Sequence, residues 1–411
     1  MDLTIAVFLL VYLAMAFGHL PGFKVDRTGA AIVGAMILIA LGLITPQAAW
    51  EAIDYRTIGL LFGLMVVSAA FVVAGFYDKV ARLIGGLKVS PPVLLAILIA
   101  VSAGLSALLT NDVVVVAMTP VLVSIALARR LNPVPFLLGF CFAANVGSAA
   151  TIIGGPQNMI AAAALELSFT GFMRVAAVPA LLGLPIVWVV ITFLYRGKWE
   201  LAAAGGAATP SPPPETSAFN MGETIKATIV TTAVVAAFVL TDWPHMLVAM
   251  AGAAVLLVNR RIASNDMLRE VDGDLLLLLM GLFVVNAALA ATGLPQQMLA
   301  EFKGAGLDLH DPFSMLIVMS VLSNLVGNNP AVMLVAPFLT DVARPEALGA
   351  AIALGAGFSS NMLIFGSLAG IIVAEQARAH GVKISFGEFS RAGLPVALLC
   401  LALAAVWILW L

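Results

Sequence analysis

The sequence predicts an all-α polytopic membrane protein built from two inverted repeats. The 411 residues are 62% hydrophobic and only 10% charged, and their mean hydropathy of +1.09 is well above that of soluble domains. Apolar runs long enough to cross a bilayer recur along the whole chain. A short polar motif interrupts such a run near Asn111, and a similar motif recurs near Asn328. We therefore expect about ten transmembrane helices and two re-entrant hairpins with broken helices.

The expected spans follow from the length and hydropathy of each apolar stretch. They cover residues 3–18, 28–44, 57–76, 134–166, 174–195, 224–241, 245–258, 274–292, 347–374 and 393–411. Residues 91–128 and 312–342 are expected as hairpins that enter and leave on one side. This depth is inferred from the polar residues at their turns, because an acid is costly where it meets lipid and tolerated where protein or water surrounds it.

Lysine and arginine set the expected orientation, since cytoplasmic loops carry an excess of both. With the amino terminus outside, 16 of the 20 basic residues fall in inner loops and 4 in outer loops. The inner set is Lys24, Arg27, Lys79, Arg82, Lys88, Arg129, Arg130, Arg196, Lys198, Lys226, Arg260, Arg261, Arg269, Arg378, Lys383 and Arg391. The outer set is Arg56, Arg174, Lys303 and Arg344. Both termini are therefore expected outside a plasma (inner) membrane.

The repeat is visible as pairs of like residues at a constant separation. Asn111 matches Asn328 and Pro120 matches Pro337, each pair 217 positions apart. Upstream, the pairs 218 positions apart are Gly34 and Gly252, Asp54 and Asp272, Gly63 and Gly281, and Gly75 and Gly293. Five predicted crossings, an odd number, lie between matching points, so the second copy should be upside down relative to the first.

This pairing divides the chain into three expected parts. Residues 1–195 form the first inverted repeat and residues 224–411 the second. Between them, residues 196–223 are rich in glycine and proline, which is typical of a flexible or polyproline-like linker. The basic residues place this linker in the cytoplasm.

Four polar segments are expected at membrane depth, two at hairpin tips and two inside broken spans. The tips are 110–112 and 327–330, and the breaks are 145–158 and 359–367. Glycine and proline interrupt the helical hydrogen-bond ladder, which frees carbonyl groups for a cation and N–H groups for an anion. Close packing of small residues would explain a single glycine or serine here, but not four segments repeated in order.

Asp112 is the only acid expected at membrane depth. No lysine or arginine lies in its own motif, and an intramembrane acid of this kind is a functional-site hypothesis by default. We expect its carboxylate to exchange a proton for a cation or a solute. The alternative is a carboxylic acid that is simply hydrogen-bonded at a hairpin turn.

Several classes of function are not supported by the sequence. A net charge of −2 does not favour a nucleic-acid partner. Cys141 and Cys400 lie in apolar segments, as expected of packing thiols rather than of a disulfide or a metal site. No phosphate-binding loop and no metal-ligand cluster is apparent. We therefore expect that the protein is not an enzyme and that it has no cofactor. Bound sodium ions are the one alternative left open.

These motifs resemble the ion transporter superfamily, which contains arsenite permeases of the ArsB type, sodium/proton antiporters of the NhaD type, plant silicon effluxers and divalent anion/sodium symporters. The resemblance rests on the first tip with Thr119 and Pro120, on the run 154–158 and on the second tip at 323–330. The segments 361–369 and 386–395 resemble the ArsB-like branch most. The resemblance to the superfamily extends from about residue 20 to the end of the chain and does not include the linker.

The resemblance implies a scaffold domain and a mobile transport domain that works by an elevator-like movement. It also implies a cation site near each hairpin tip with the solute between them. The implied solute-binding residues are Thr110, Asn111, Asn158, Asn328, Asn329, Ser360 and Asn361. The implied ion-coupling residues are Asp112, Asn111, Ser148, Thr151, Asn328 and Ser359. Membrane lipid is an expected partner, and a homodimer is left open.

Three functions compete. The first is ion-coupled transport of a small inorganic oxyanion or its neutral acid, similar to arsenite or silicate, driven by protons. The second is sodium/proton exchange, and the third is sodium-coupled carriage of a di- or tricarboxylate such as citrate or succinate. A doubly charged solute needs positive charge nearby, whereas the expected transport core has no buried lysine or arginine and carries Asp112. The first function is therefore favoured.

Overall fold

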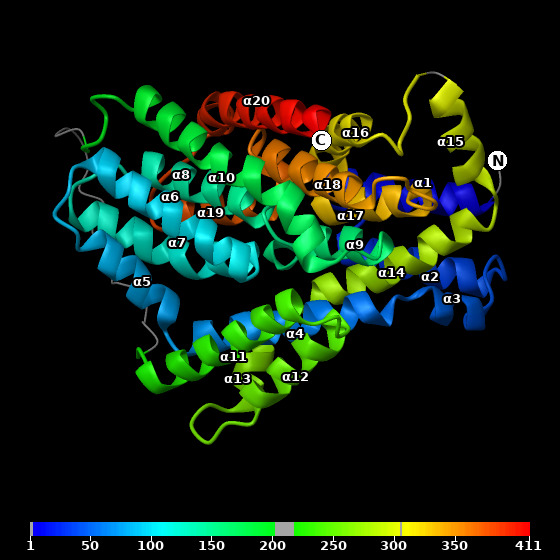
Figure 1. Ribbon diagram of the computed structural model, residues 1–411, viewed down its shortest axis with the longest axis horizontal. Coiled ribbons are helices and arrows are strands. Elements are labelled where there is room, and N and C mark those ends of the chain that lie inside the picture. The colour runs from blue at the N-terminus through cyan, green and yellow to red at the C-terminus, as the bar shows by residue number, and fades with distance from the viewer. Residues whose placement is uncertain (1–2, 202–217, 305) are drawn as a thin grey trace.

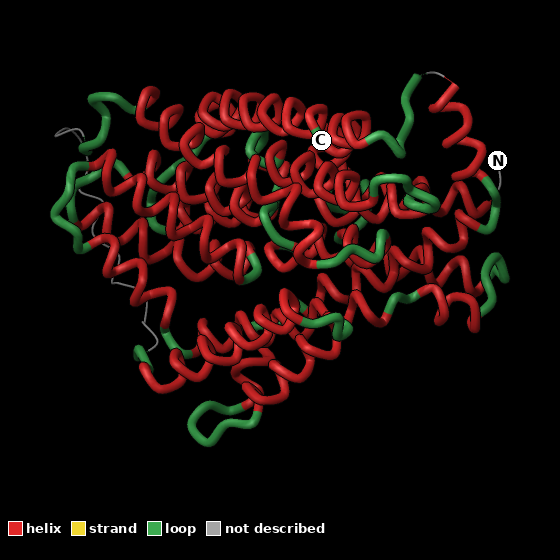
Figure 2. The backbone as a smooth tube through the Cα atoms, viewed as in Figure 1, coloured by secondary structure: helices red, strands yellow, loops and turns green. Residues whose placement is uncertain are grey.

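The computed structural model describes residues 3–201, 218–304 and 306–411. In these ranges the chain folds into α-helices joined by short loops, with three 3-10 turns and two isolated β-bridges, His19 with Asp26 and Leu131 with Glu200 (Figure 2). Most of the linker expected at 196–223, residues 202–217, lies outside the described residues.

The first half of the described chain contains ten α-helices and one 3-10 turn. These are α1 (Leu3–Phe17), α2 (Arg27–Ala40), α3 (Pro46–Ala52), α4 (Tyr55–Val73), α5 (Phe76–Gly85), α6 (Pro91–Leu108), α7 (Asn111–Ala128), α8 (Pro133–Ser148), η1 (Ile152–Gly154), α9 (Pro156–Ala164) and α10 (Phe169–Leu194).

The second half repeats this order. Its elements are α11 (Met221–Leu240), α12 (His245–Leu257), α13 (Ser264–Arg269), α14 (Gly273–Ala290), α15 (Leu294–Gly304), α16 (Pro312–Val326), α17 (Asn328–Val335), η2 (Ala336–Phe338), α18 (Pro345–Ser359), η3 (Ile364–Gly366), α19 (Leu368–Ala379) and α20 (Phe386–Trp410). Each helix of the first half therefore has a counterpart ten places later, and a 3-10 turn follows both α8 and α18.

The helices form two groups that lie side by side (Figure 1). One group holds α2–α4 and α11–α14, in which α4 packs on α12 and α2 packs on α14. The other holds α6–α10 and α16–α20, in which α6 packs on α8, α16 packs on α18, and α10 packs on α20. Both groups draw helices from both halves of the sequence, so neither half forms a group alone.

Two glycines allow the helices of the first group to cross closely. A Cβ atom on Gly63 would lie 2.7 Å from the carbonyl carbon of Ala249, and one on Gly281 would lie 2.7 Å from that of Ala31. The two glycines and the two alanines are each 218 positions apart. The same backbone contact therefore occurs twice, which is why glycine is needed at both positions.

The caps of α4 and α14 also match. Oδ1 of Asp54 accepts a hydrogen bond from the backbone N–H of Arg56, and Oδ1 of Asp272 accepts one from Leu275. Each aspartate satisfies an N–H group that the first turn leaves free. Both lie at the ends of predicted spans, where the sequence places them.

The protein is an integral membrane protein. Seven helices in the described ranges have at least 18 residues and are apolar enough to cross a membrane: α4, α6, α7, α10, α11, α14 and α20. Five shorter apolar helices accompany them: α1, α2, α8, α12 and α16. The short helices α3, α5, α13 and α15 are not among the predicted elements, because segments of 6 to 11 residues are too short to cross a bilayer, so length and hydropathy do not mark them.

The segments predicted as hairpins fold as the helix pairs α6–α7 and α16–α17. Because α6 and α7 are each long enough to cross a membrane, the re-entrant depth of the first pair stays a prediction. The first turns at Leu109 and Thr110, and the second at Gly327, whose φ of +92° is a conformation that glycine adopts without strain. The predicted breaks appear between α8 and α9 and between α18 and α19. Pro156 begins α9, where its missing N–H costs no hydrogen bond.

Candidate functional site

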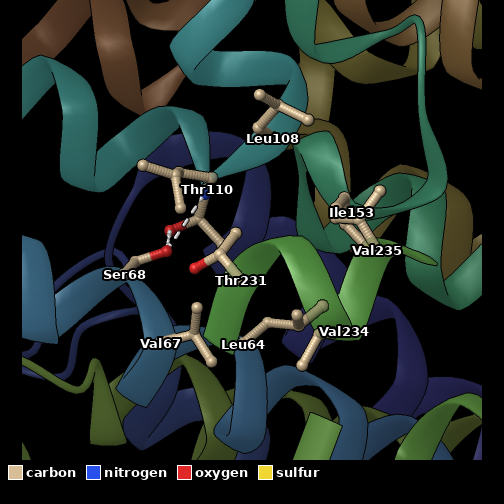
Figure 3. A pocket seen from close by; sticks show the side chains of 10 residues that line it. Leu64, Val67, Ser68, Leu108, Thr110, Ile153, Thr231, Val234 and Val235 are labelled. Atoms are coloured by element: carbon tan, nitrogen blue, oxygen red, sulfur yellow. Dashed lines mark hydrogen bonds between the residues drawn. The ribbon is translucent and has the colours of Figure 1, made fainter. Parts of the chain in front are cut away.

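The first tip is attached to α4 through Thr110. Its hydroxyl and its backbone N–H each lie 3.4 Å from Oγ of Ser68, which is buried. The hydroxyl of Thr231 on α11 lies in the same small pocket and has no hydrogen-bond partner. Figure 3 shows Ser68, Thr110 and Thr231 gathered at this point from three elements. Neither Ser68 nor Thr231 is predictable from the sequence, because a lone hydroxyl in an apolar span has no distinctive pattern.

Asn111 and Asp112 follow at the start of α7. Asn111 is buried, and its Oδ1 has no hydrogen-bond partner. Asp112 is partly buried and forms no hydrogen bond or ion pair with any described residue. The first tip thus presents one unpaired amide oxygen and one unpaired carboxylate.

The first break is held together by Asn158. Its Nδ2 donates to the carbonyl oxygens of Ser148, at 2.8 Å, and of Thr151, at 2.9 Å. The carbonyl of Ser148 has lost its helical partner, and that of Thr151 keeps one bond of 3.3 Å from the N–H of Gly154, so the side chain supplies the missing bonds. The hydroxyl of Thr151 donates to the carbonyl of Ala107 on α6, 2.5 Å away, which attaches the break to the first hairpin. Oδ1 of Asn158 stays buried and unpaired.

The second tip contacts the second break directly. Ser360 donates its hydroxyl to Oδ1 of Asn328 at 3.0 Å, and the hydroxyls of Ser323 and Ser359 lie 2.8 Å apart. Asn324 donates its Nδ2 to the carbonyl of Ser359 at 3.1 Å, and its Oδ1 is left without a partner. Oδ1 of Asn329 is likewise buried and unpaired.

The second tip is also attached to the first helix group. Asn286 on α14 donates its Nδ2 to the carbonyl of Met333, 2.5 Å away. The hydroxyl of Tyr12 on α1 donates to Oδ1 of Asn286 at 3.2 Å and lies 3.5 Å from the carbonyl of Pro330. Asn286 and Ser68 are 218 positions apart, so equivalent places on α4 and α14 hold the two tips.

The two breaks are bonded to each other across the halves of the chain. Nδ2 of Asn145 donates to Oδ1 of Asn361 at 2.9 Å and to Oγ of Ser367 at 3.2 Å. Nδ2 of Asn361 is buried without a partner. No hydrogen bond joins Asn111 to Asn328 in the described ranges, so the breaks rather than the tips connect the two halves of the site.

Unpaired polar atoms concentrate at these four segments. In the described ranges, ten buried side-chain oxygen or nitrogen atoms have no hydrogen-bond partner. Seven belong to the tips and breaks or lie beside them: Ser106, Asn111, Asn158, Thr231, Asn324, Asn329 and Asn361. Each such group costs about 1–3 kcal/mol unless something pairs with it, so their gathering indicates a place where a solute, an ion or water binds.

One basic side chain lies beside the second tip. Nη1 of Arg27 is 3.7 Å from the position that a Cβ atom on Gly327 would occupy, and Arg27 is only partly exposed. This differs from the expectation of a core without nearby lysine or arginine. The expectation failed because Arg27 was assigned to an inner loop, whereas it begins α2 and reaches toward α16–α17.

The atoms of the site that can coordinate a cation are amide, hydroxyl and carbonyl oxygens and one carboxylate. Such oxygens suit a hard cation such as sodium better than a transition metal. The described residues contain no group of three or more His, Cys, Asp or Glu side chains that could hold a metal ion. Cys141 and Cys400 are both buried free thiols, and Sγ of Cys400 lies 3.8 Å from the carbonyl oxygen of Gly183.

A cavity of about 690 Å³ reaches the first break. It opens between the start of α4, the end of α9, the start of α10 and the loop from α11 to α12. Ile152 in the break and Met159 on α9 line its inner end, and Arg56, Glu166 and Asp242 line its polar part.

Residues 10–349 match the citrate transporter family, which is most of the sequence. The chain belongs to the citrate transporter family. This confirms the resemblance to the ion transporter superfamily that the hairpin motifs indicated.

Individual relatives agree with this assignment. The chain is 29% identical to a 46 kDa membrane protein of Mycobacterium leprae (strain TN), over 100% of this chain and 98% of that protein. It is 28% identical to a silicon efflux transporter of Oryza sativa subsp. japonica, over 95% of this chain and 94% of that one. The solved YdaH transporter of Alcanivorax borkumensis shares the fold with a TM-score of 0.57 and 16% identity, over 99% of this chain and 97% of that chain. This member of the family is therefore a membrane transporter.

Proposed function

We propose that this transporter carries a small inorganic oxyanion or its neutral acid across the plasma membrane, coupled to protons. The main observation in support is the repeated unit of hairpin tip and broken helix. Both copies have unpaired buried amide atoms, and only one has an ionisable acid, Asp112. Neutral amides and hydroxyls bind and release a small polar solute at low cost, while the single carboxylate can take up or lose a proton.

We propose further that the halves form inverted repeats, residues 1–195 and 224–411. The recurring helix order, the matched contacts of Gly63 and Gly281 and the matched caps at Asp54 and Asp272 support this division. An odd number of crossings between matching points puts the hairpins on opposite sides of the membrane. Both termini are then outside, and residues 196–223 are cytoplasmic.

The proposed movement is an elevator. Helices α6–α10 and α16–α20 carry both tips and both breaks, and α2–α4 with α11–α14 form the scaffold beside them. Few side-chain bonds join the tips to this scaffold, chiefly Ser68 with Thr110 and Asn286 with Met333. Sliding the transport group past the scaffold exchanges these bonds and moves the site from one side to the other. The 690 Å³ cavity supplies a route from one side to the first break in the present arrangement.

The proposed solute-binding residues are Thr110, Asn111, Asn158, Asn328, Asn329, Ser360 and Asn361. The proposed ion-coupling residues are Asp112, Asn111, Ser148, Thr151, Asn328 and Ser359. In the structure Asn158 uses its Nδ2 to hold the break, so its Oδ1 is the atom left for a solute. The hydroxyl of Ser359 is bonded to Ser323, and its carbonyl accepts from Nδ2 of Asn324 and from the N–H of Met362, so a cation at Ser359 displaces one of these bonds.

Carriage of a citrate-like carboxylate is the second candidate. The description of the family favours it, and so does the guanidinium of Arg27 beside the second tip. Against it stands Asp112, whose negative charge opposes a solute with two or three carboxylates. Sodium/proton exchange is a third candidate, and it would use the same acid, Asp112.

Transport by purified protein in proteoliposomes decides between these candidates. The panel is arsenite, silicate, phosphate, citrate and succinate, each tested with a proton gradient and with a sodium gradient. The proposal expects accumulation of an inorganic oxyanion or acid under a proton gradient. Accumulation of citrate or succinate alone, under a sodium gradient, would replace it with the second candidate. Sodium release coupled to protons without any solute would support the third.

A further inference from the structure

A half-buried arginine stands at the second hairpin tip without a carboxylate partner. Arg27 begins α2, and its Nε donates to the carbonyl of Met15 on α1 at 2.9 Å. That bond fixes the guanidinium at Nε and leaves its two terminal nitrogens, Nη1 and Nη2, without a hydrogen-bond partner among the described residues. In the described ranges no ion pair involves Arg27, and the adjacent Asp26 is used as the cap of α2, accepting from the N–H of Gly29 at 2.8 Å.

The free end of this guanidinium is directed at Gly327. A Cβ atom there would lie 3.7 Å from Nη1 of Arg27, and glycine leaves that space open. The φ of +92° at Gly327 turns the chain between α16 and α17, so glycine serves both the turn and the approach of the arginine. The scaffold thereby places a positive charge on the transport group.

The backbone at the same point also favours negative charge. α17 begins at Asn328, and its cap, Gly327, has no side chain to bond the free N–H groups of Asn328 and Asn329, while Pro330 has no N–H. Free N–H groups at a helix start attract an anion, and a guanidinium within reach strengthens that attraction.

Two amide oxygens on the hairpin that contains Gly327 lack a donor among the described residues. Oδ1 of Asn324 is fixed as an acceptor, since its Nδ2 donates to the carbonyls of Ser320 and Ser359, and it has no donor of its own. Oδ1 of Asn329 is also unpaired. A hydroxyl on the ligand satisfies such an oxygen, whereas a fully deprotonated anion does not.

We infer that Arg27 binds the charged oxygen of the solute at the second tip, so that the solute is an oxyanion that also carries a hydroxyl group. A partly protonated inorganic oxyanion and a hydroxycarboxylate both have this chemistry. The inference rests on the proposed function, which makes the second tip part of the solute site. Of the two transported species that the proposed function allows, the oxyanion and its neutral acid, it selects the oxyanion.

The test compares anionic with neutral probes on purified full-length protein. The protein is placed in nanodiscs of phosphatidylcholine, so that no anionic lipid headgroup competes for the arginine. Binding of phosphate, arsenate and citrate is measured by titration calorimetry at neutral pH, with arsenous acid as the neutral probe and nitrate as an anion without a hydroxyl group. Arg27→Gln and Arg27→Lys are compared with Arg260→Gln, which removes the same charge from an exposed loop.

We expect Arg27→Gln to weaken binding of phosphate, arsenate or citrate by about tenfold or more, since bonds to a charged group are worth roughly 1.5–3 kcal/mol. Binding of arsenous acid should be unchanged, Arg27→Lys should be intermediate, and nitrate should bind weakly to every variant. Arg260→Gln should behave as wild type. Anion binding that survives in Arg27→Gln would overturn the inference, and so would equal losses of anion and neutral acid.

If Arg27→Gln does not fold, Arg27→Lys with the nitrate comparison still decides the matter. A folded Arg27→Lys that binds anions as wild type does, or a wild type that binds nitrate as well as phosphate, would contradict the inference. Anion binding that depends on Arg27 in a protein that transports none of the probes would instead support the inference and remove the proposed function.

Discussion

Nδ2 of Asn145 lies 2.9 Å from Oδ1 of Asn361, although the two residues are 216 positions apart in the chain. This bond connects the broken helix of the first half to that of the second. In the breaks, Ser148 matches Ser360 and Gly154 matches Gly366, each pair 212 positions apart. By this separation position 145 pairs with Gly357, so the bond has no counterpart. The polar centre between the halves is therefore asymmetric, as a site for one solute should be.

Replacing Asn145 by alanine should reduce transport at least tenfold. The change removes the donor to Asn361 and to Ser367, and it leaves Oδ1 of Asn361 unpaired as well. Initial rates in proteoliposomes measure the effect. Asn259→Ala is the matched control, because Asn259 also donates a side-chain bond, to Glu223, but at a loop far along the chain from the tips and breaks. Equal rates in both variants would show that the bridge is not part of the site.

Bulky apolar side chains at the tips should abolish transport and leave expression intact. Asn111→Leu and Asn328→Leu remove amide groups that contribute few bonds to folding, since Oδ1 of Asn111 is unpaired and Asn328 accepts only from Ser360. Yield and melting temperature report folding, and solute uptake reports function. Normal uptake by both variants would place the solute elsewhere and favour helix packing as the role of these segments.

A disulfide between the first tip and the scaffold should stop transport reversibly. The hydroxyls of Ser68 and Thr110 lie 3.4 Å apart, so cysteines at both positions are close enough to be joined. Oxidation of Ser68→Cys/Thr110→Cys, with Cys141 and Cys400 replaced by alanine, should block uptake, and a reductant should restore it. Each single cysteine variant is the control. Uptake that continues in the fully cross-linked protein would contradict an elevator-like movement.

The two sides of the membrane should be reported by single cysteine probes. Lys198→Cys should react with an impermeant maleimide only from the cytoplasm, and Leu307→Cys only from outside. The native thiols are buried, so they should contribute little background. Labelling of both probes from the same side would break the inverted-repeat argument.

Much of the fold is predictable from the sequence, because hydropathy marks the spans and glycine, proline and asparagine mark the interruptions. Thus α6–α7 and α16–α17 were located by their polar turns, and the breaks at 148–156 and 359–368 by their glycines. Contacts between the segments were not predictable. Ser68 and Asn286 are single polar residues on long apolar helices, and only the packing of α4 and α14 shows that they hold the tips.

Arg27 shows the same limit from the other direction. Counting basic residues by loop assigns each of them to one side of the membrane but does not show which residues it contacts. An arginine that begins a helix and points toward the protein therefore cannot be told from one in solvent. Its proximity to Gly327 depends on how α1, α2 and α16–α17 meet, and no periodicity in the sequence records that.

The most direct test of the account is Asp112→Asn. The variant keeps the shape and the hydrogen-bonding capacity of the side chain but cannot ionise. Proton-driven accumulation of the solute and solute counterflow are measured in the same proteoliposomes. We expect driven accumulation to be lost while counterflow is partly retained, because counterflow needs the site and the movement but no net ion transfer. Accumulation that survives the substitution would contradict proton coupling at Asp112 and would move the coupling to neutral amide, hydroxyl and carbonyl ligands.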